Sequence, residues 1–401
     1  MRKFSFFFGI LLAFSCSKDC VPLYSPLDQA KEVHFSDALF KGLDFDFAPV
    51  QIVRDRNNTI YVVGHENNDS RDIRFLKLDD AFKIINGTRI KGNFIFSSLG
   101  LIMNSKNQFV VLNCTNPSYN GEDYRKIIID STGKIISEIH LERLDFFGRA
   151  NSFLETPNGD LIILSTGYAS PKAIFQQNIM LTRLNASGKI VWNKIFNEPD
   201  LVGSKIKLTN SKDGIYLVAE SDKYYVAHEF RFKILNLDGV PSVEKSYLNP
   251  VYGTILPNID ILQTNEGQFI TVYNTSIEDC ALSNFFISYI DDKGIEIWIK
   301  RYGLVKRQVS IKQILQTKDG SFVILFSIYN GQSDIALIKI NASGDITWFK
   351  SYGRKSLSEQ AIAMVEKSNG NLVILGASNS KESDSHFQAI FLETNTEGNP
   401  Q

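Results

Sequence analysis

Short apolar segments alternate with turn residues along almost the whole chain, and Asp334–Gly353 shows this pattern most clearly. Alternating apolar residues from Ala336 to Ile340 predict a strand with one buried face. Asn341–Gly344 supplies a turn, and Ile346–Tyr352 follows as a second predicted strand. The stretch therefore predicts a β-hairpin.

Two turn markers repeat along the sequence. The first is a turn residue followed by mostly apolar positions, and it recurs about every 50 residues, a period that fits one four-stranded propeller blade. Its turn residues are Asn58, Asn107, Gly159, Gly214, Gly267, Gly320 and Gly370. The second marker closes the later hairpin of each repeat, at Phe82, Gly133, Gly188, Gly239, Gly294, Gly344 and Gly398. The seven occurrences of each marker predict seven blades.

The sixth repeat shows how the four strands of a blade are expected to lie. From the innermost to the outermost, we expect them at Ser310–Thr317, Phe322–Ser327, Ile335–Asn341 and Ile346–Tyr352. The second strand is apolar on both faces, as expected between neighbouring blades. Outermost strands carry aromatic pairs four residues apart, which share a face and are expected to pack on a neighbouring surface: Trp192/Phe196, Trp298/Tyr302 and Trp348/Tyr352.

The last repeat ends at Gln401 without a fourth strand. The segment Val33–Phe40 precedes the first repeat as an outer strand precedes each later one, so we expect it to pair in the last blade and close the ring. The expected fold is therefore all-β: a seven-bladed β-propeller of four-stranded antiparallel blades over residues 32–401.

The N-terminal residues 1–15 have the pattern of a signal peptide. Arg2 and Lys3 precede an apolar run, Phe4–Phe14, of about 11 residues, which is too short to span a bilayer. Its end, Leu12–Cys16, resembles a bacterial lipoprotein signal, which implies a lipidated Cys16. Residues 16–31 would then be the lipidated cysteine and a flexible tether. The alternative is an ordinary secretory signal in which Cys16 has no role.

Several motifs resemble the β-propeller repeat lipoproteins of Bacteroidota. They are Trp298–Gly303, Trp348–Gly353 and the hairpin before Trp348, together with Ser17–Asp19, which resembles the charged export tag of surface lipoproteins in that phylum. There is a weaker similarity to quinoprotein-like propellers, which also place a Trp four residues after the turn Gly. The resemblance implies a lipid anchor at the outer membrane, in a periplasmic or surface-exposed position.

Composition and charge exclude some functions. The formal net charge is −1, so no basic surface for nucleic acid is expected. Of the four cysteines, Cys16, Cys20, Cys114 and Cys280, three remain if Cys16 is lipidated, and a Cys114–Cys280 bridge stays open. The histidines are scattered and no Cys/His cluster occurs, so we expect no metal site and no cofactor.

The sequence contains no motif of a known catalytic site such as GxSxG, a P-loop or HExxH. Acidic pairs such as Asp79/Asp80 and Asp291/Asp292 fall in turns, where they favour turn geometry. The chain is therefore expected to be a non-enzymatic membrane-anchored module that binds a protein or glycan. Two alternatives stay open: a glycan-active hydrolase or lyase with acidic residues in the propeller channel, and an accessory subunit of an outer-membrane complex.

A ligand-binding face is expected where two kinds of links gather: those between the second and third strands, and those from one blade to the next. These links carry aromatic and basic side chains suited to binding. The candidates are Tyr119, Tyr168, Tyr224, Tyr225, Tyr329, Phe147, Arg149, Tyr252 and Arg307.

Overall fold

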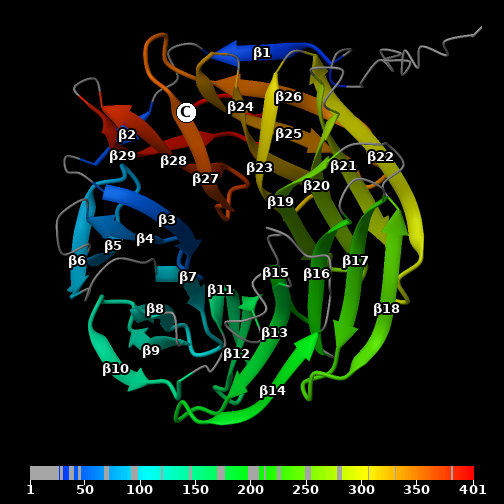
Figure 1. Cartoon of the computed structure of the whole chain (residues 1–401). Coiled ribbons are helices and arrows are strands. Elements are labelled where there is room, and N and C mark those ends of the chain that lie inside the picture. The colour runs from blue at the N-terminus through cyan, green and yellow to red at the C-terminus, as the bar shows by residue number, and fades with distance from the viewer. Residues whose placement is uncertain are drawn as a thin grey trace, which may run out of the picture.

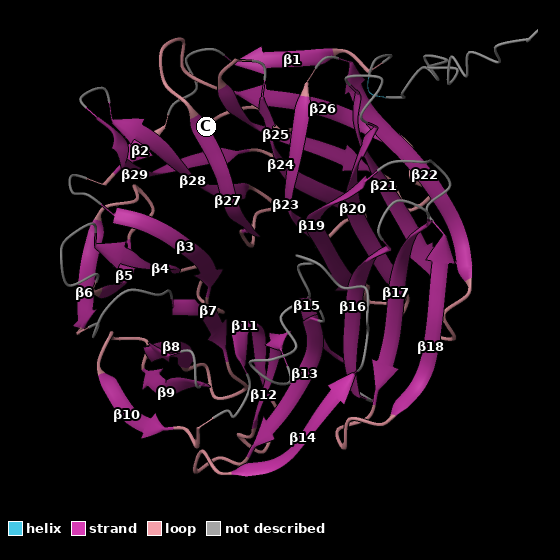
Figure 2. Cartoon of the chain, in the orientation of Figure 1, coloured by secondary structure: helices cyan, strands magenta, loops and turns pink. Residues whose placement is uncertain are grey.

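A computed structural model of the 401-residue chain shows strands as its regular elements (Figures 1 and 2). The structure describes residues 27, 30–35, 40–43, 47–66, 72–91, 98–118, 121–143, 147–168, 177–196, 207–211, 214–223, 227–248, 254–277, 282–305, 307–329, 331–380 and 383–401. Among these residues, no helix has the length and apolar character needed to cross a membrane.

The described strands form six four-stranded sheets and one five-stranded sheet. In chain order, the first three sheets are β3 (Phe47–Arg54), β4 (Ile60–Glu66), β5 (Ile73–Leu78) and β6 (Ile84–Ile90); β7 (Ser98–Met103), β8 (Phe109–Ser118), β9 (Gly121–Ile129) and β10 (Ile135–His140); and β11 (Phe147–Glu155), β12 (Leu161–Tyr168), β13 (Gln177–Leu184) and β14 (Ile190–Phe196). The next two are β15 (Lys207–Ser211), β16 (Gly214–Lys223), β17 (Ala227–Leu235) and β18 (Pro241–Leu248); and β19 (Thr254–Gln263), β20 (Phe269–Ile277), β21 (Leu282–Ile290) and β22 (Glu296–Val305).

The N-terminal residues contribute to the last two sheets. One contains β23 (Gln308–Gln316), β24 (Phe322–Tyr329), β25 (Ser333–Ile340) and β26 (Ile346–Tyr352), with β1 (Glu32–Phe35) as a fifth strand. The other contains β27 (Glu359–Glu366), β28 (Leu372–Ser380) and β29 (Ser383–Thr394), with β2 (Lys41–Gly42) at its edge. The predicted all-β propeller of four-stranded antiparallel blades is confirmed. In the sixth repeat, β26 has the bounds predicted for the outermost strand, Ile346–Tyr352.

The sheets are arranged around a central axis, with the first strand of each sheet innermost (Figure 1). These first strands contact one another in sequence, and β27 contacts β3. Buried apolar residues form a cluster between each pair of neighbouring sheets, for example Val323, Leu325 and Ile335 against Ala361 and Ile374. All residues from Phe322 to Ile328 in β24 are buried, which explains why a second strand is apolar on both faces.

The turns before the outer strands are built alike. The Asn341 side chain accepts hydrogen bonds from the backbone of Ser343 at 3.0 Å and Asp345 at 2.8 Å, and Gly344 closes the turn with a φ of 78°. Two of the three predicted aromatic pairs, Trp298/Tyr302 and Trp348/Tyr352, donate hydrogen bonds to such turns in the next sheet. The buried Tyr302 hydroxyl donates to the Gly344 carbonyl at 2.5 Å, and Trp298 Nε1 donates to the Ala342 carbonyl at 3.2 Å.

The same arrangement recurs one sheet later, where Tyr352 donates to the Gly398 carbonyl at 2.6 Å and Trp348 Nε1 to the Thr396 carbonyl at 3.3 Å. Burial raises the pKa of Tyr352, so its hydroxyl stays protonated and donates. These aromatic pairs therefore join neighbouring sheets and are not part of a binding site.

The prediction that Val33–Phe40 pairs in the last sheet is wrong for Val33–Phe35, while residues 36–39 lie outside the described residues. Instead, β1 pairs in parallel with β26, with Val33 opposite Lys350 and Phe35 opposite Tyr352. The rings of Phe35 and Tyr352 stack at 5.5 Å. Among the described N-terminal residues, Lys41–Gly42 pairs with β29. The distance of this segment from the first repeat suggests an outer strand of the last blade, but the free edge of β26 accepts β1 as a parallel strand, and no spacing in the sequence indicates this.

The N-terminal segment is also fixed before β1. Leu27 is 2% exposed and belongs to the apolar cluster between the β19–β22 and β23–β26 sheets, against which Ala30 also packs. This residue lies within the segment expected to be a flexible tether. Its burial places part of that segment on the propeller.

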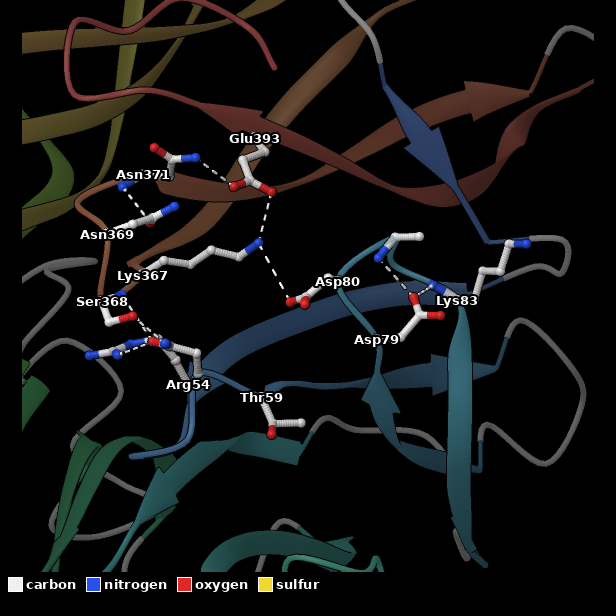
Figure 3. A network of polar contacts seen from close by, with 12 residues as sticks. Arg54, Thr59, Asp79, Asp80, Lys83, Lys367, Ser368, Asn369, Asn371 and Glu393 are labelled. Atoms are coloured by element: carbon white, nitrogen blue, oxygen red, sulfur yellow. Dashed lines mark hydrogen bonds and ion pairs between the residues drawn. The ribbon is translucent and has the colours of Figure 1, made fainter.

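The last sheet meets the first through contacts that differ from the other junctions. Phe82 occupies the position of the turn glycines with a φ of 63°, is 3% exposed, and stacks on Phe391 of β29 at 5.1 Å. Lys41 Nζ lies 5.2 Å from the centre of the Phe82 ring. Figure 3 shows Lys367 reaching Glu393 at 2.8 Å and Asp80 at 3.9 Å. The short β2 is therefore supplemented by an aromatic contact and a polar network.

Candidate binding site on the loop face

The loop face is the side of the propeller that carries the links between second and third strands, such as 331–332, and the links between sheets, such as 353–358. The described candidates lie at two separate sheets there: Phe147, Arg149 and Tyr168 in the β11–β14 sheet, and Tyr329 and Arg307 at the β23–β26 sheet. Phe147 and Tyr168 are opposite each other where β11 pairs with β12, and Arg149 is opposite Thr166. Tyr329 ends β24, and Arg307 directly precedes β23.

Five predicted functional residues lie outside the described residues. They are the lipidation residue Cys16 and the candidate ligand-binding residues Tyr119, Tyr224, Tyr225 and Tyr252. Cys20 and Cys280 also lie outside, so the expected alternatives for the cysteines stay predictions.

A polar cavity of about 440 Å³ lies on the loop face beside β1. We call it the loop-face cavity. Its lining residues come from β1, β24 and β25, from the link between β24 and β25, and from the links before β23 and after β26: Glu32, His34, Arg307, Ile328, Gln332, Asp334, Arg354 and Lys355. Arg307 is the predicted residue that lines it. Because Ile328 faces the cavity and neighbouring residues on a strand point to opposite faces, Tyr329 points away from it and is 49% exposed.

One side of the cavity is held by β1. Arg307 Nη1 donates to both carboxylate oxygens of Glu32, at 2.8 Å each. The Ser351 hydroxyl donates to Glu32 at 2.7 Å and lies 2.9 Å from His34 Nδ1. These contacts join β1 to the link before β23, and they explain why the parallel strand takes this register.

The other side is held by the link after β26. Arg354 donates through Nε to Glu359 at 2.7 Å and through Nη2 to Ser378 at 2.7 Å. Glu359 is fully buried; burial raises its pKa, while the contact with Arg354 opposes this rise. Gln332 donates to the Arg354 carbonyl at 2.6 Å, which fixes the link between β24 and β25 against this one.

Asp334 lies between these two sides. Burial raises the pKa of its carboxyl group, His34 and Arg307 oppose the rise, and Glu32 adds to it. Asp334 Oδ1 lies so close to Gly353 that a Cβ at this position would clash with it. A side chain at position 353 would therefore displace Asp334.

The carboxylates of this site are mostly engaged in structural contacts. Glu32 is bound by Arg307 and Ser351, and the Glu359 carboxylate is buried against Arg354. Glycoside hydrolysis needs two carboxyl groups that both face the substrate, one as acid and the other as base or nucleophile. Asp334 alone does not supply such a pair, so the arrangement suits binding better than hydrolysis. Among the described residues, no group of acidic, histidine or cysteine side chains could hold a metal ion.

Several cavity residues were missed from the sequence. Glu32 and His34 were placed in a different sheet, which removed them from consideration. Arg354 and Lys355 follow Gly353 in a link between sheets, and this position is the signal that could have identified them. Gln332 and Asp334 follow shortly after Tyr329, which the sequence identified as a candidate.

Comparisons with known proteins support the fold. No protein-family model and no curated protein matches the chain. Among solved structures, extracellular domains 1-2 of Drosophila Semaphorin 1a align with 10% identity and a TM-score of 0.50, covering 88% of each chain. A member of the DUF4221 family from Bacteroides vulgatus has 14% identity, a TM-score of 0.39, and covers 91% of this chain and 98% of its own.

A protein of unknown function from Bacteroides caccae has 12% identity and a TM-score of 0.41, covering 73% of this chain and 92% of its own. The structural neighbours of the chain therefore include two proteins from Bacteroides. Each likeness is one of fold.

Proposed function

We propose that this chain is a seven-bladed, non-enzymatic propeller lipoprotein that binds a protein or glycan at the outer membrane. The five-stranded β1/β23–β26 sheet counts as one blade, and Lys41–Gly42 supplies the outer strand of the last one. The loop-face cavity is the observation that carries the binding role. Its volume of about 440 Å³ falls within the range of small-ligand sites.

The mechanism is display on a rigid ring. Links from neighbouring sheets are held in place by the contacts of Arg307 with Glu32 and of Arg354 with Glu359. A surface whose side chains are already ordered loses less conformational entropy when a ligand binds. The cavity therefore needs little rearrangement to accept its ligand.

The membrane anchor rests on the sequence. The basic and apolar pattern before Cys16 supports lipidation of this residue, and acyl chains contribute about 0.8 kcal/mol per buried CH₂. Cys16→Ser should release the protein from membranes into the soluble fraction. Unchanged membrane retention of this variant would rule out lipidation as the anchor.

Affinity isolation of the lipidated protein from its native membrane tests the binding role. We expect a protein or glycan to be recovered with the wild type and lost with Lys355→Glu, because Lys355 is an exposed residue of the cavity. Lys293→Glu is the matched control, since Lys293 is equally an exposed lysine but lies in a turn on the opposite face. Recovery of no partner, together with cleavage of glycans in solution, would contradict the proposal and favour the enzymatic alternative.

A further inference from the structure

Three basic side chains line the loop-face cavity, and each keeps donors that its structural contacts do not use. Arg307 binds Glu32 through Nη1 alone, so in the described part of the chain its Nε and Nη2 have no hydrogen-bond partner. Its side chain is 30% exposed. The guanidinium group is therefore held in place by one nitrogen while two others are open to a ligand.

Arg354 and Lys355 contribute in different ways. Arg354 uses Nε and Nη2 for Glu359 and Ser378 and lies over the Phe40 ring at 5.2 Å. Its Nη1 has no hydrogen-bond partner among the described residues. Lys355 is exposed and forms no ion pair with the described residues. The two arginines are thus preorganised, and the lysine is free to adjust to a bound group.

The acceptors of the cavity are fewer. Glu32 is occupied by Arg307 and Ser351, so Asp334 is the carboxylate of the lining that remains for a ligand. A carboxylate accepts hydrogen bonds from hydroxyl groups, while open guanidinium and ammonium donors bind a ligand carboxylate. The cavity thus combines donors for one acidic group with an acceptor for neutral hydroxyls.

We propose that the loop-face cavity binds a sugar acid, with its carboxylate on Arg307, Arg354 and Lys355 and a hydroxyl group donating to Asp334. This inference rests on the proposed function, because it specifies the ligand of the same cavity. Charged donors in a partly enclosed site bind a carboxylate more strongly than neutral donors do. Discrimination between an acidic and a neutral sugar is therefore expected to come from these three side chains.

Calorimetric titration of the purified full chain tests the inference with three probes: glucuronate, glucose and acetate. Glucose lacks the carboxylate and acetate lacks the ring, so we expect glucuronate to bind more tightly than either. Lys355→Gln should weaken glucuronate binding about tenfold, the loss expected for one hydrogen bond to a charged group. Lys293→Gln, on the opposite face, should leave it unchanged. Neither lysine is buried, so both variants are expected to fold.

Two results would overturn the inference: glucuronate binding no tighter than glucose binding, or equal affinities in Lys355→Gln and the wild type. Its failure can be told apart from failure of the proposed function. If wild-type protein still recovers a partner from native membranes while glucuronate does not bind, the sugar-acid ligand is wrong and the binding role stands. If it recovers none and cleaves glycans, the binding role itself is wrong.

Discussion

Replacing Phe82 by glycine tests how the last sheet is joined to the first. The other turns at this position contain glycine, so a rule based on turn geometry predicts that Phe82→Gly is harmless or stabilising. The structure predicts the opposite. Phe82 is 3% exposed, stacks on Phe391 at 5.1 Å, and lies beneath Lys41 and Lys367 at 5.2 and 5.7 Å.

The magnitude follows from two opposing effects. Removing a buried phenylalanine ring costs about 3–5 kcal/mol. Position 82 has a φ of 63°, which strains a residue other than glycine. Glycine removes this strain and so stabilises the folded state by about 1–2 kcal/mol. The expected net loss of stability is therefore about 1–4 kcal/mol.

Urea unfolding followed by circular dichroism would measure this loss. Asn107→Gly is the matched control, because Asn107 has a φ of 58° in another turn and carries no buried ring. We expect the control to be neutral or more stable and Phe82→Gly to unfold at lower urea. Hydrogen exchange of the Leu43 amide, which donates to Ala389 at 3.1 Å, should also accelerate in Phe82→Gly. Equal stability of the two variants would refute the role assigned to the aromatic contact.

Two further predictions concern the N-terminal segment and the cavity. Leu27→Ala should destabilise the protein by about 2–5 kcal/mol, because Leu27 is 2% exposed in an apolar cluster; an unchanged urea midpoint would show that residue 27 belongs to a free tether. Asp334→Asn should stabilise the protein at neutral pH. The raised pKa of Asp334 means that the wild type loses stability as pH rises through that pKa, and asparagine does not titrate. The gain should vanish below the ordinary aspartate pKa of about 3.9, and a gain of equal size at pH 3 and pH 7 would contradict this explanation.

Much of the fold could be predicted because each repeat contains its own local signals. The alternation in Ile346–Tyr352, the turn at Asn341–Gly344 and the apolar run after Gly320 each identify an element without knowledge of its partners. The positive φ at Phe82 also follows from its place in the repeat. Such signals are local in sequence, so a single chain reveals them.

The N-terminal strand and the cavity depend instead on contacts between distant residues. Whether Val33 pairs with β26 or β29 is decided by Phe35 on Tyr352 and Glu32 on Arg307, and no periodicity encodes that choice. The error carried over to the site, because Glu32 and His34 could not be assigned to the loop face. Arg307 could be identified as a candidate from its position in a link between sheets, whereas its ion-pair partner Glu32 could not.

Lysine labelling in native membranes tests the central claim, that the protein binds its partner through the loop face. Lys355 and Lys293 are both exposed, on the loop face and on the opposite face respectively. If the claim is right, an amine-reactive reagent should modify Lys355 less in native membranes than in the purified protein, while Lys293 reacts equally in both. Equal modification of Lys355 in the two preparations would contradict it.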